Sequence, residues 1–214
     1  MVTAFIRLNG ATVGCVANRS EVYTDGEKTA TYDAALTAAG CEKAAAFVNF
    51  CDAFEIPVLT LVNVDGYKNC KCNEKKIAKA AARLTYAFAN ADVPKVTVVV
   101  GKANGTAGLT MNSKSIGSDI VYAWKNAKIG VMEAAPAVKI MYADEIAKAD
   151  NAAALINEKA AQYNEMQASA LAAAKRGYVD DIIEASETRQ RVAAAFEMLF
   201  TKREDRPSKK HGTI

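Results

Sequence analysis

The chain has 214 residues, of which 51% are apolar, and this is enough for one large domain with a sizeable core. Its 27 basic and 24 acidic residues leave a net charge of only +3, which argues against nucleic acid as the main partner. No apolar run approaches the roughly 20 residues of a membrane-spanning helix, and the single histidine, His211 in the polar tail, excludes serine–histidine and cysteine–histidine catalysis.

The first part of the chain predicts two short strands followed by a helix. Residues 2–8 and 11–17 read as strands, and Asn9-Gly10 between them is typical of a hairpin turn. Residues 21–31 are polar, and we expect them to be irregular. Residues 41–54 carry apolar side chains at helical spacing and predict an amphipathic helix.

Two apolar runs predict the centre of the fold. Residues 58–62 and 96–100 contain no charged side chain, as suits strands that are buried on both faces. Residues 74–90 carry an apolar stripe and predict the helix that connects these strands. The alternation of strand and helix calls for an α/β fold, in which we expect the two strands to be adjacent and parallel.

The segment after residue 100 predicts a helix start that holds an anion. Gly105-Thr106-Ala107-Gly108 forms a small-residue turn, and residues 109–116 are expected to be helical. The first N–H groups of a helix have no partner inside it and carry the positive end of its dipole. They are therefore suited to an anion, or to an oxygen that becomes negative during a reaction.

The remainder of the chain is predicted to be mostly helical. Apolar runs at residues 120–124 and 129–132 come first. Three segments rich in Ala, Glu and Lys then favour helices, at residues 135–149, 152–169 and 186–202.

The five cysteines favour a reduced, cytoplasmic protein. Cys15, Cys41 and Cys51 lie in apolar segments and are expected to be buried. Cys70 and Cys72 lie in a polar loop, where we expect two reduced thiols. A metal site would need further ligands, and because the only histidine is in the tail, no metal is expected.

Several longer motifs carry a resemblance to a known family. The chain resembles the C-terminal half of the carboxyltransferase (beta) subunit of biotin-dependent acyl-CoA carboxylases and decarboxylases, of the propionyl-CoA carboxylase type. The matching residues in the central stretch are Lys102-Ala103-Asn104-Gly105-Thr106-Ala107-Gly108, Met111, Ser113-Lys114, Gly117, Asp119, Tyr122-Ala123-Trp124 and Val131-Met132. Further matches are FVNFCDAFEIP at residues 47–57, RGYVDDII at 176–183, Thr188-Arg189, and the basic terminus. The resemblance therefore covers essentially the whole chain.

The resemblance implies a fold and a function. It implies a crotonase-like superhelix of repeated strand–strand–helix turns, with the domain at residues 1–203 and a basic tail at residues 204–214. It further implies the biotin-side half of an acyl-CoA carboxyltransferase, which moves a carboxyl group between carboxybiotin and an acyl-CoA. The acyl-CoA half would be on another chain, biotin would arrive on a carrier protein, and the assembly would be a homo-oligomer.

The resemblance also implies the site residues. The biotin-side oxyanion donors fall on the backbone N–H groups of Thr106 and Ala107, with Gly105 beside them. Gly66 and Tyr67 lie in the loop that borders the active site in the family. That loop, residues 63–70, lacks the two prolines and the last glycine of the family pattern, and Thr106 replaces a glycine.

These departures leave the choice between two main interpretations open. The chain is either a catalytic half or a non-catalytic scaffold subunit that keeps the fold but not the biotin pocket. A third possibility is a stand-alone crotonase-like enzyme that acts on an acyl-CoA. It is disfavoured because no carboxylate or histidine stands out as its acid or base; Asp52, Asp65, Asp119 and Glu133 are more simply interpreted as surface, cap or turn residues.

Overall fold

The main sheet of the protein runs through the centre of the body. The computed structural model describes residues 1–149 and 151–204, so most of the predicted tail at 204–214 lies outside the described residues. The strand order is β1-β2-β6-β8-β9-β11, and β10 pairs with the end of β8. These strands are β1 (Val2–Leu8), β2 (Ala11–Ala17), β6 (Val58–Val64), β8 (Lys95–Asn104), β9 (Ile120–Trp124), β10 (Lys128–Gly130) and β11 (Asp181–Ile183).

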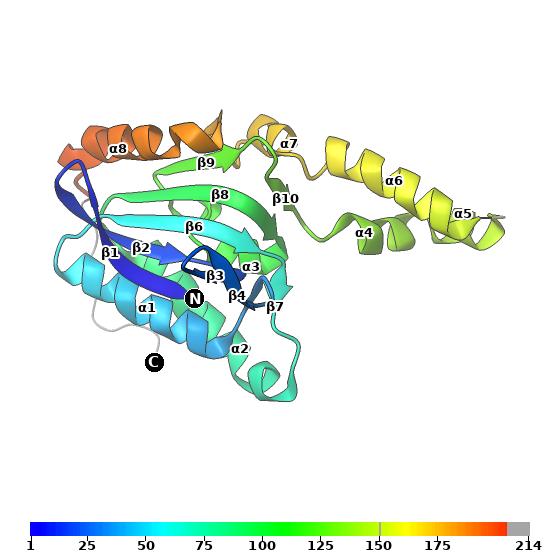
Figure 1. Ribbon diagram of the computed structural model, residues 1–214, viewed down its shortest axis with the longest axis horizontal. Coiled ribbons are helices and arrows are strands. Elements are labelled where there is room, and N and C mark those ends of the chain that lie inside the picture. The colour runs from blue at the N-terminus through cyan, green and yellow to red at the C-terminus, as the bar shows by residue number, and fades with distance from the viewer. Residues whose placement is uncertain (150, 205–214) are drawn as a thin grey trace.

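Two small sheets and a set of helices complete the fold (Figure 1). The small sheets pair β3 (Glu21–Thr24) with β4 (Glu27–Thr31) and β5 (Ala35–Leu36) with β7 (Gly66–Tyr67). The helices are α1 (Ala38–Ala53), α2 (Lys71–Asn90), α3 (Gly105–Thr110), α4 (Ala134–Met141), α5 (Ala143–Lys148), α6 (Ala152–Met166), α7 (Ala170–Lys175) and α8 (Thr188–Met198), with 3-10 turns at Lys114–Ile116, Ala185–Glu187 and Leu199–Thr201.

The two predicted central strands are adjacent and parallel, as expected. β6 pairs with β8 in a register that places Val58 opposite Lys95 and Val62 opposite Val99. Both faces of β8 are covered, because Val96 and Val98 pack in the core on the α8 side while Val99 packs in the core under α1 and α2. The helix that connects β6 and β8 along the chain is α2, so the prediction for residues 74–90 is confirmed.

Three local predictions were wrong at their ends or in type. Residues 21–31 form the β3–β4 hairpin around Asp25-Gly26, both of which have positive φ, instead of an irregular segment. The helix predicted at 109–116 begins at Gly105 and ends at Thr110, because Asn112 has a φ of 54° and turns the chain. The helix predicted at 135–149 is broken at Tyr142 into α4 and α5.

Helices α4, α5 and α6 form an arm that projects away from the body (Figure 1). The arm returns to the body through α7 and β11, which pairs in parallel with β9. None of the helices within residues 1–149 and 151–204 combines the length and the hydropathy that crossing a bilayer requires.

A buried polar cluster fixes the chain after α3. The Thr97 hydroxyl donates to the Asn112 carbonyl at 2.7 Å and accepts from the Asn112 side-chain amide at 2.9 Å. The Ser118 hydroxyl lies 3.0 Å from the same Thr97 oxygen. Because Asn112 and Thr97 are both fully buried, this cluster holds the turn that ends α3 against the middle of β8.

Thr97→Val is expected to destabilise the protein by about 1–3 kcal/mol, since an isosteric methyl removes the hydrogen bonds that the Thr97 hydroxyl makes with the buried Asn112 carbonyl and side-chain amide. The measurement is the free energy of unfolding in urea. Thr31→Val, an exposed strand position in β4, is the matched control and should change it little. Equal effects of the two substitutions would contradict the role given to the cluster.

Candidate active site

The start of α3 is held by two glycines against the neighbouring strands. Gly105 has a φ of 57°, a left-handed conformation, and a Cβ there would lie 3.0 Å from the Val131 carbonyl oxygen. A Cβ at Gly108 would lie 2.7 Å from the backbone carbon of Ala103. The family motif around Gly105 therefore has a structural cause, because only glycine lets the helix start so close to the ends of β8 and β10.

The predicted backbone donors lie in the first turn of α3. Gly105, Thr106 and Ala107 are its first three residues, and no side chain caps the helix. Within the described part of the chain, the N–H groups of Thr106 and Ala107 donate to no group outside α3 itself. Neither N–H is thus used outside the helix, which is the condition under which a helix start can hold an oxygen or an anion.

A large pocket of about 580 Å³ opens at this helix start. Its volume falls in the range of small-molecule sites. It is lined by the starts and ends of several elements and by the base of the arm: Val62, Thr97, Val99, Ala103, Gly105, Thr106, Gly108, Leu109, Met111, Ser113, Lys114, Ser115, Val121, Ile129, Gly130, Val131, Tyr163, Gln167, Arg176, Tyr178 and Val179. Gly105 and Thr106 thus line the pocket, whereas Ala107, Gly66 and Tyr67 are not among its lining residues.

The side chain of Ala107 points into the core, where it is only 1% exposed. Its methyl group packs among the buried residues between the sheet and the α1–α2 layer. Thr106, in contrast, is exposed and presents its side chain at the pocket. The two predicted donors therefore differ in surroundings, and only Thr106 adds side-chain bulk next to a bound group.

Tyr67 lies against α3, although it does not line the pocket. The Tyr67 hydroxyl is 3.2 Å from the hydroxyl of Thr110, which donates in turn to the Thr106 carbonyl at 2.9 Å. Gly66 precedes Tyr67 in β7 and has open space where a Cβ would lie. The structure thus brings Tyr67, from the 63–70 loop, to the same helix as the predicted donors.

A network centred on Lys102 joins the loops around the helix start, and sequence reasoning missed it. The Lys102 ammonium lies 3.0 Å from Asp65 and 2.8 Å from Glu133, and the Asn104 amide donates to Asp65 at 3.2 Å. The hydrogen bond to Glu133, followed by that to Asp65, raises the pKa of Lys102 above its ordinary value. Asp65 and Glu133, expected to be simple surface or turn residues, therefore tie the segments after β6 and β10 to the segment just before Gly105.

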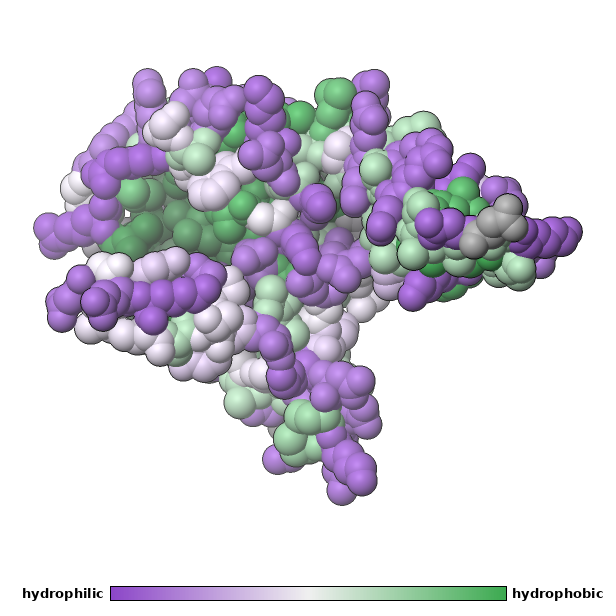
Figure 2. Space-filling model, turned by 45° about the vertical axis from the view of Figure 1, so that its right-hand side comes forward, coloured by the Kyte–Doolittle hydropathy of each residue, from purple (hydrophilic) through white to green (hydrophobic). Residues whose placement is uncertain are grey.

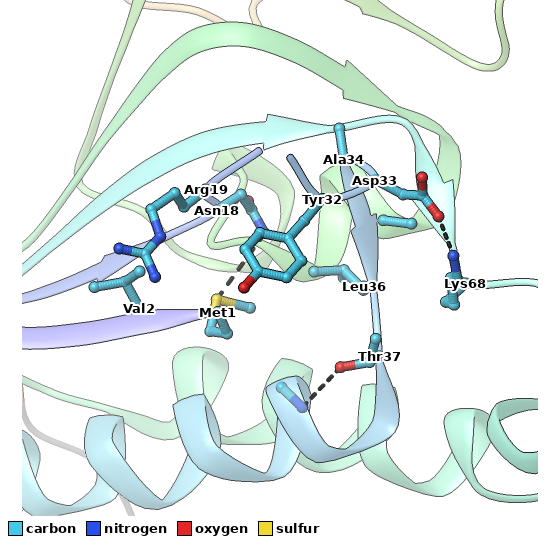
Figure 3. Close-up of a pocket in the computed structure, with 12 residues that line it drawn as sticks. Met1, Val2, Asn18, Arg19, Tyr32, Asp33, Ala34, Leu36, Thr37 and Lys68 are labelled. Atoms are coloured by element: carbon cyan, nitrogen blue, oxygen red, sulfur yellow. Dashed lines mark hydrogen bonds and ion pairs between the residues drawn. The ribbon is translucent and has the colours of Figure 1, made fainter. Parts of the chain in front are cut away.

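A second cavity of about 280 Å³ lies beside β5 and the start of α1. Figure 3 shows Arg19 and Tyr32 at one side of this cavity and the Lys68–Asp33 ion pair at the other. Thr37 caps α1 at its edge by accepting a hydrogen bond from an N–H of the first turn at 3.1 Å. Lys68 belongs to the 63–70 loop, so the loop that departs from the family pattern borders this cavity.

Comparison with known proteins identifies the family. The carboxyl transferase domain matches residues 1–214. The chain is 42% identical over 215 residues to the methylmalonyl-CoA carboxyltransferase 12S subunit of Propionibacterium freudenreichii subsp. shermanii, covering 100% of this chain and 39% of that protein. It is 41% identical over 221 residues to the methylmalonyl-CoA decarboxylase subunit alpha of Propionigenium modestum, covering 100% of this chain and 40% of that protein. The chain thus spans about two fifths of the length of these curated relatives.

Superposition on a solved structure agrees with the family match. The transcarboxylase 12S crystal structure, a hexamer assembly with methylmalonyl-coenzyme A and methylmalonic acid bound, superposes with a TM-score of 0.88 at 43% identity, over 98% of this chain and 39% of that chain. This likeness confirms the α/β, crotonase-like fold that the resemblance implied. The chain therefore belongs to the carboxyl transferase domain family.

Proposed function

We propose that this chain is the biotin-side half of an acyl-CoA carboxyltransferase, with the acyl-CoA half supplied by another chain. The observation that carries the proposal is the start of α3, where uncapped N–H groups meet a pocket of about 580 Å³. Support also comes from the carboxyl transferase domain match over residues 1–214 and from the 42% and 41% identity to two carboxyltransferase-family subunits.

In this proposal the chain contributes to catalysis by stabilising negative charge with fixed backbone dipoles. Biotin, brought by a carrier protein, supplies the transferable carboxyl group, and the acyl-CoA is the second substrate. The N–H groups of Thr106 and Ala107 donate to the oxygen that becomes negative during transfer. Such donors need no titrating side chain, and each is worth a few kcal/mol in a site that excludes water.

The surrounding residues suit this role. Gly105 removes the Cβ that would otherwise push the helix start away from the Val131 carbonyl. The Lys102 network ties the segment just before the donors to Asp65, which is next to Gly66. We assign Lys102 a positioning role, because its ammonium is already engaged by Asp65 and Glu133.

The arm supports assembly with other chains. Its exposed apolar side chains include Ile140 at 70%, Met141 at 60% and Met166 at 65% exposure. Figure 2 shows apolar surface among polar residues on the arm, on the right of the view. Apolar surface that one chain leaves uncovered is typical of protein–protein contacts, so we propose a homo-oligomer that also binds the acyl-CoA half.

The experiment is reconstitution of carboxyl transfer from two chains. The chain would be mixed with the N-terminal part of the 12S subunit, the part of that relative outside the matched region. The substrate pair would be carboxylated biotin with propionyl-CoA, or free biotin with methylmalonyl-CoA for the reverse direction, with acyl-CoA products followed by mass. Size-exclusion chromatography with light scattering would report the assembly. Transfer only in the mixture supports the proposal.

A scaffold subunit is the second candidate, and Thr106 favours it. A β-branched side chain stands at the pocket where the family has glycine, and it takes up space beside the donors. If the chain is a catalytic half, this side chain restricts the pocket without removing the N–H donor. If the chain is a scaffold subunit, the same side chain prevents the bicyclic ring of biotin from entering the pocket.

Thr106→Gly is expected to preserve or raise the rate of transfer in the reconstituted pair, because the donor remains and the pocket widens. The rate with each variant is compared at equal concentrations of the two chains. Ala39→Gly, at an exposed position in the first turn of α1 that does not line this pocket, is the control for a loosened helix start. Transfer by Thr106→Gly alone, with none by the wild type, would establish the scaffold interpretation.

A further inference from the structure

Two cysteines lie side by side where the polar loop after β7 enters α2. The Sγ atoms of Cys70 and Cys72 are 3.0 Å apart. This is about 1 Å longer than the roughly 2.05 Å bond of a disulfide, so a small side-chain rotation closes the gap. Cys70 is half-buried and Cys72 is exposed, which leaves the pair accessible from solvent.

The segment around the pair is held from both sides. Asn73, a buried residue next to Cys72, donates from its side-chain amide to the Lys68 carbonyl at 2.8 Å. Its side-chain oxygen accepts from the Ala38 N–H, at the start of α1, at 2.7 Å. These bonds fix the chain on either side of the two thiols, so their proximity is built into the loop and does not depend on a chance meeting of mobile side chains.

The electrostatics gives the two thiols different roles. The hydrogen bond from the Cys72 thiol, followed by that from the Asn73 backbone N–H, lowers the pKa of Cys70 below its ordinary value. The same hydrogen bond raises the pKa of Cys72. Burial raises the pKa of Cys41 and of Cys51 to about 11, so these core thiols stay protonated. Cys70 is therefore the thiol that loses its proton more readily, and we assign it the first attack and Cys72 the second.

The surroundings favour covalent thiol chemistry over a metal centre. Within residues 1–149 and 151–204, no group of three or more histidine, cysteine, aspartate or glutamate side chains is placed to hold a metal ion. A structural metal such as zinc takes four protein ligands, and the pair offers two. A dithiol at this spacing is suited to reagents that react with two sulfur atoms at once.

We propose that Cys70 and Cys72 form a redox-active dithiol site that takes small-molecule disulfides of the glutathione disulfide class. The Cys70 thiolate attacks one sulfur of the disulfide, forms a mixed disulfide and releases one thiolate. The Cys72 thiol loses its proton and attacks Cys70 Sγ, which forms the Cys70–Cys72 bond and releases the second thiolate. The two protein thiols lose two electrons and two protons, and the small disulfide gains them as two thiols.

In the test, the full-length chain is first fully reduced and then incubated with oxidised and reduced glutathione. The reaction is quenched with acid, and the products are identified by intact mass and peptide mapping. The second step is intramolecular, with an effective concentration on the order of 1 mM or more. With reduced glutathione held at about 0.1 mM, the closed form should therefore exceed the mixed disulfide by about tenfold or more. The closed form is lighter than the reduced chain by two hydrogens.

Two variants assign the steps. Cys72→Ser should stop at a mixed disulfide on Cys70, while Cys15→Ala, a buried control, should close as the wild type does. Phenylarsine oxide, which bridges two thiols, should bind the wild type with one equivalent and lose affinity by at least about tenfold in Cys72→Ser, because one of its two thiol partners is gone. Accumulation of a mixed disulfide in the wild type, first reaction at a core cysteine, or disulfide-linked dimers as the main product would each overturn the proposal. None of these readouts depends on carboxyl transfer.

Discussion

Ala107→Pro is expected to lower the rate of carboxyl transfer in the reconstituted pair by about 10²–10³-fold, as does the loss of one oxyanion donor in other enzymes. Proline has no backbone N–H, so the substitution removes one of the two proposed donors. The position is the third residue of α3, within the first turn, where a proline removes no hydrogen bond from inside the helix. The rate is measured after circular dichroism has shown that the variant is folded.

Ala39→Pro is the matched control for this experiment. Ala39 is an exposed residue in the first turn of α1, so the substitution also removes a first-turn donor, but one of a different helix that does not line the pocket at α3. It should leave the rate within about twofold of the wild type, since no donor of the site is lost. A folded Ala107→Pro variant with the wild-type rate would show that the donors lie elsewhere.

Gly105→Ala is expected to lower the same rate by about ten- to a hundredfold, because a displacement of about 1 Å at a catalytic group has effects of that order. The added methyl meets the Val131 carbonyl at 3.0 Å, and the φ of 57° costs an alanine about 1–2 kcal/mol. The helix start must move, and the two donors move with it. The rate and the free energy of unfolding are measured together.

Gly10→Ala is the control that separates the effect of backbone strain from the effect of moving the α3 donors. Gly10 has a φ of 84° in the β1–β2 turn and open space around a Cβ, so the variant has similar backbone strain without a steric contact. It should lose a similar amount of stability and keep its rate. If both variants lose rate in proportion to stability, the close approach of Gly105 to Val131 is not what positions the donors.

Elements whose structure is determined by the sequence pattern of the segment itself were predicted well. The uncharged runs that became β6 and β8 are buried on both faces, and such strands need no long-range information to be recognised. Asn9-Gly10 forms the expected turn, with φ values of 48° and 84°. A helix after β8 was predicted, but at residues 109–116 instead of Gly105–Thr110. Its end could not be predicted, because Asn112 is held in its left-handed turn by Thr97 from another element.

Residues whose role depends on distant partners were not predicted. Asp65 and Glu133 are 68 positions apart and meet only because β6, β8 and β10 end at the same edge of the sheet, where Lys102 joins them. A signal was present, since each carboxylate closely follows a predicted strand and the carboxyl ends of parallel strands converge. The β3–β4 hairpin was missed for the opposite reason: its residues are mostly exposed, so no apolar alternation marks it.

The most direct test of the account is carboxyl transfer by the separate and combined halves. This chain alone and the N-terminal part of the 12S subunit alone should each leave carboxylated biotin and propionyl-CoA unchanged. The mixture should yield methylmalonyl-CoA, with a light-scattering mass larger than that of either component. Transfer by this chain alone, or no transfer by a mixture that has associated, even with Thr106→Gly, would contradict the assignment of a biotin-side catalytic half.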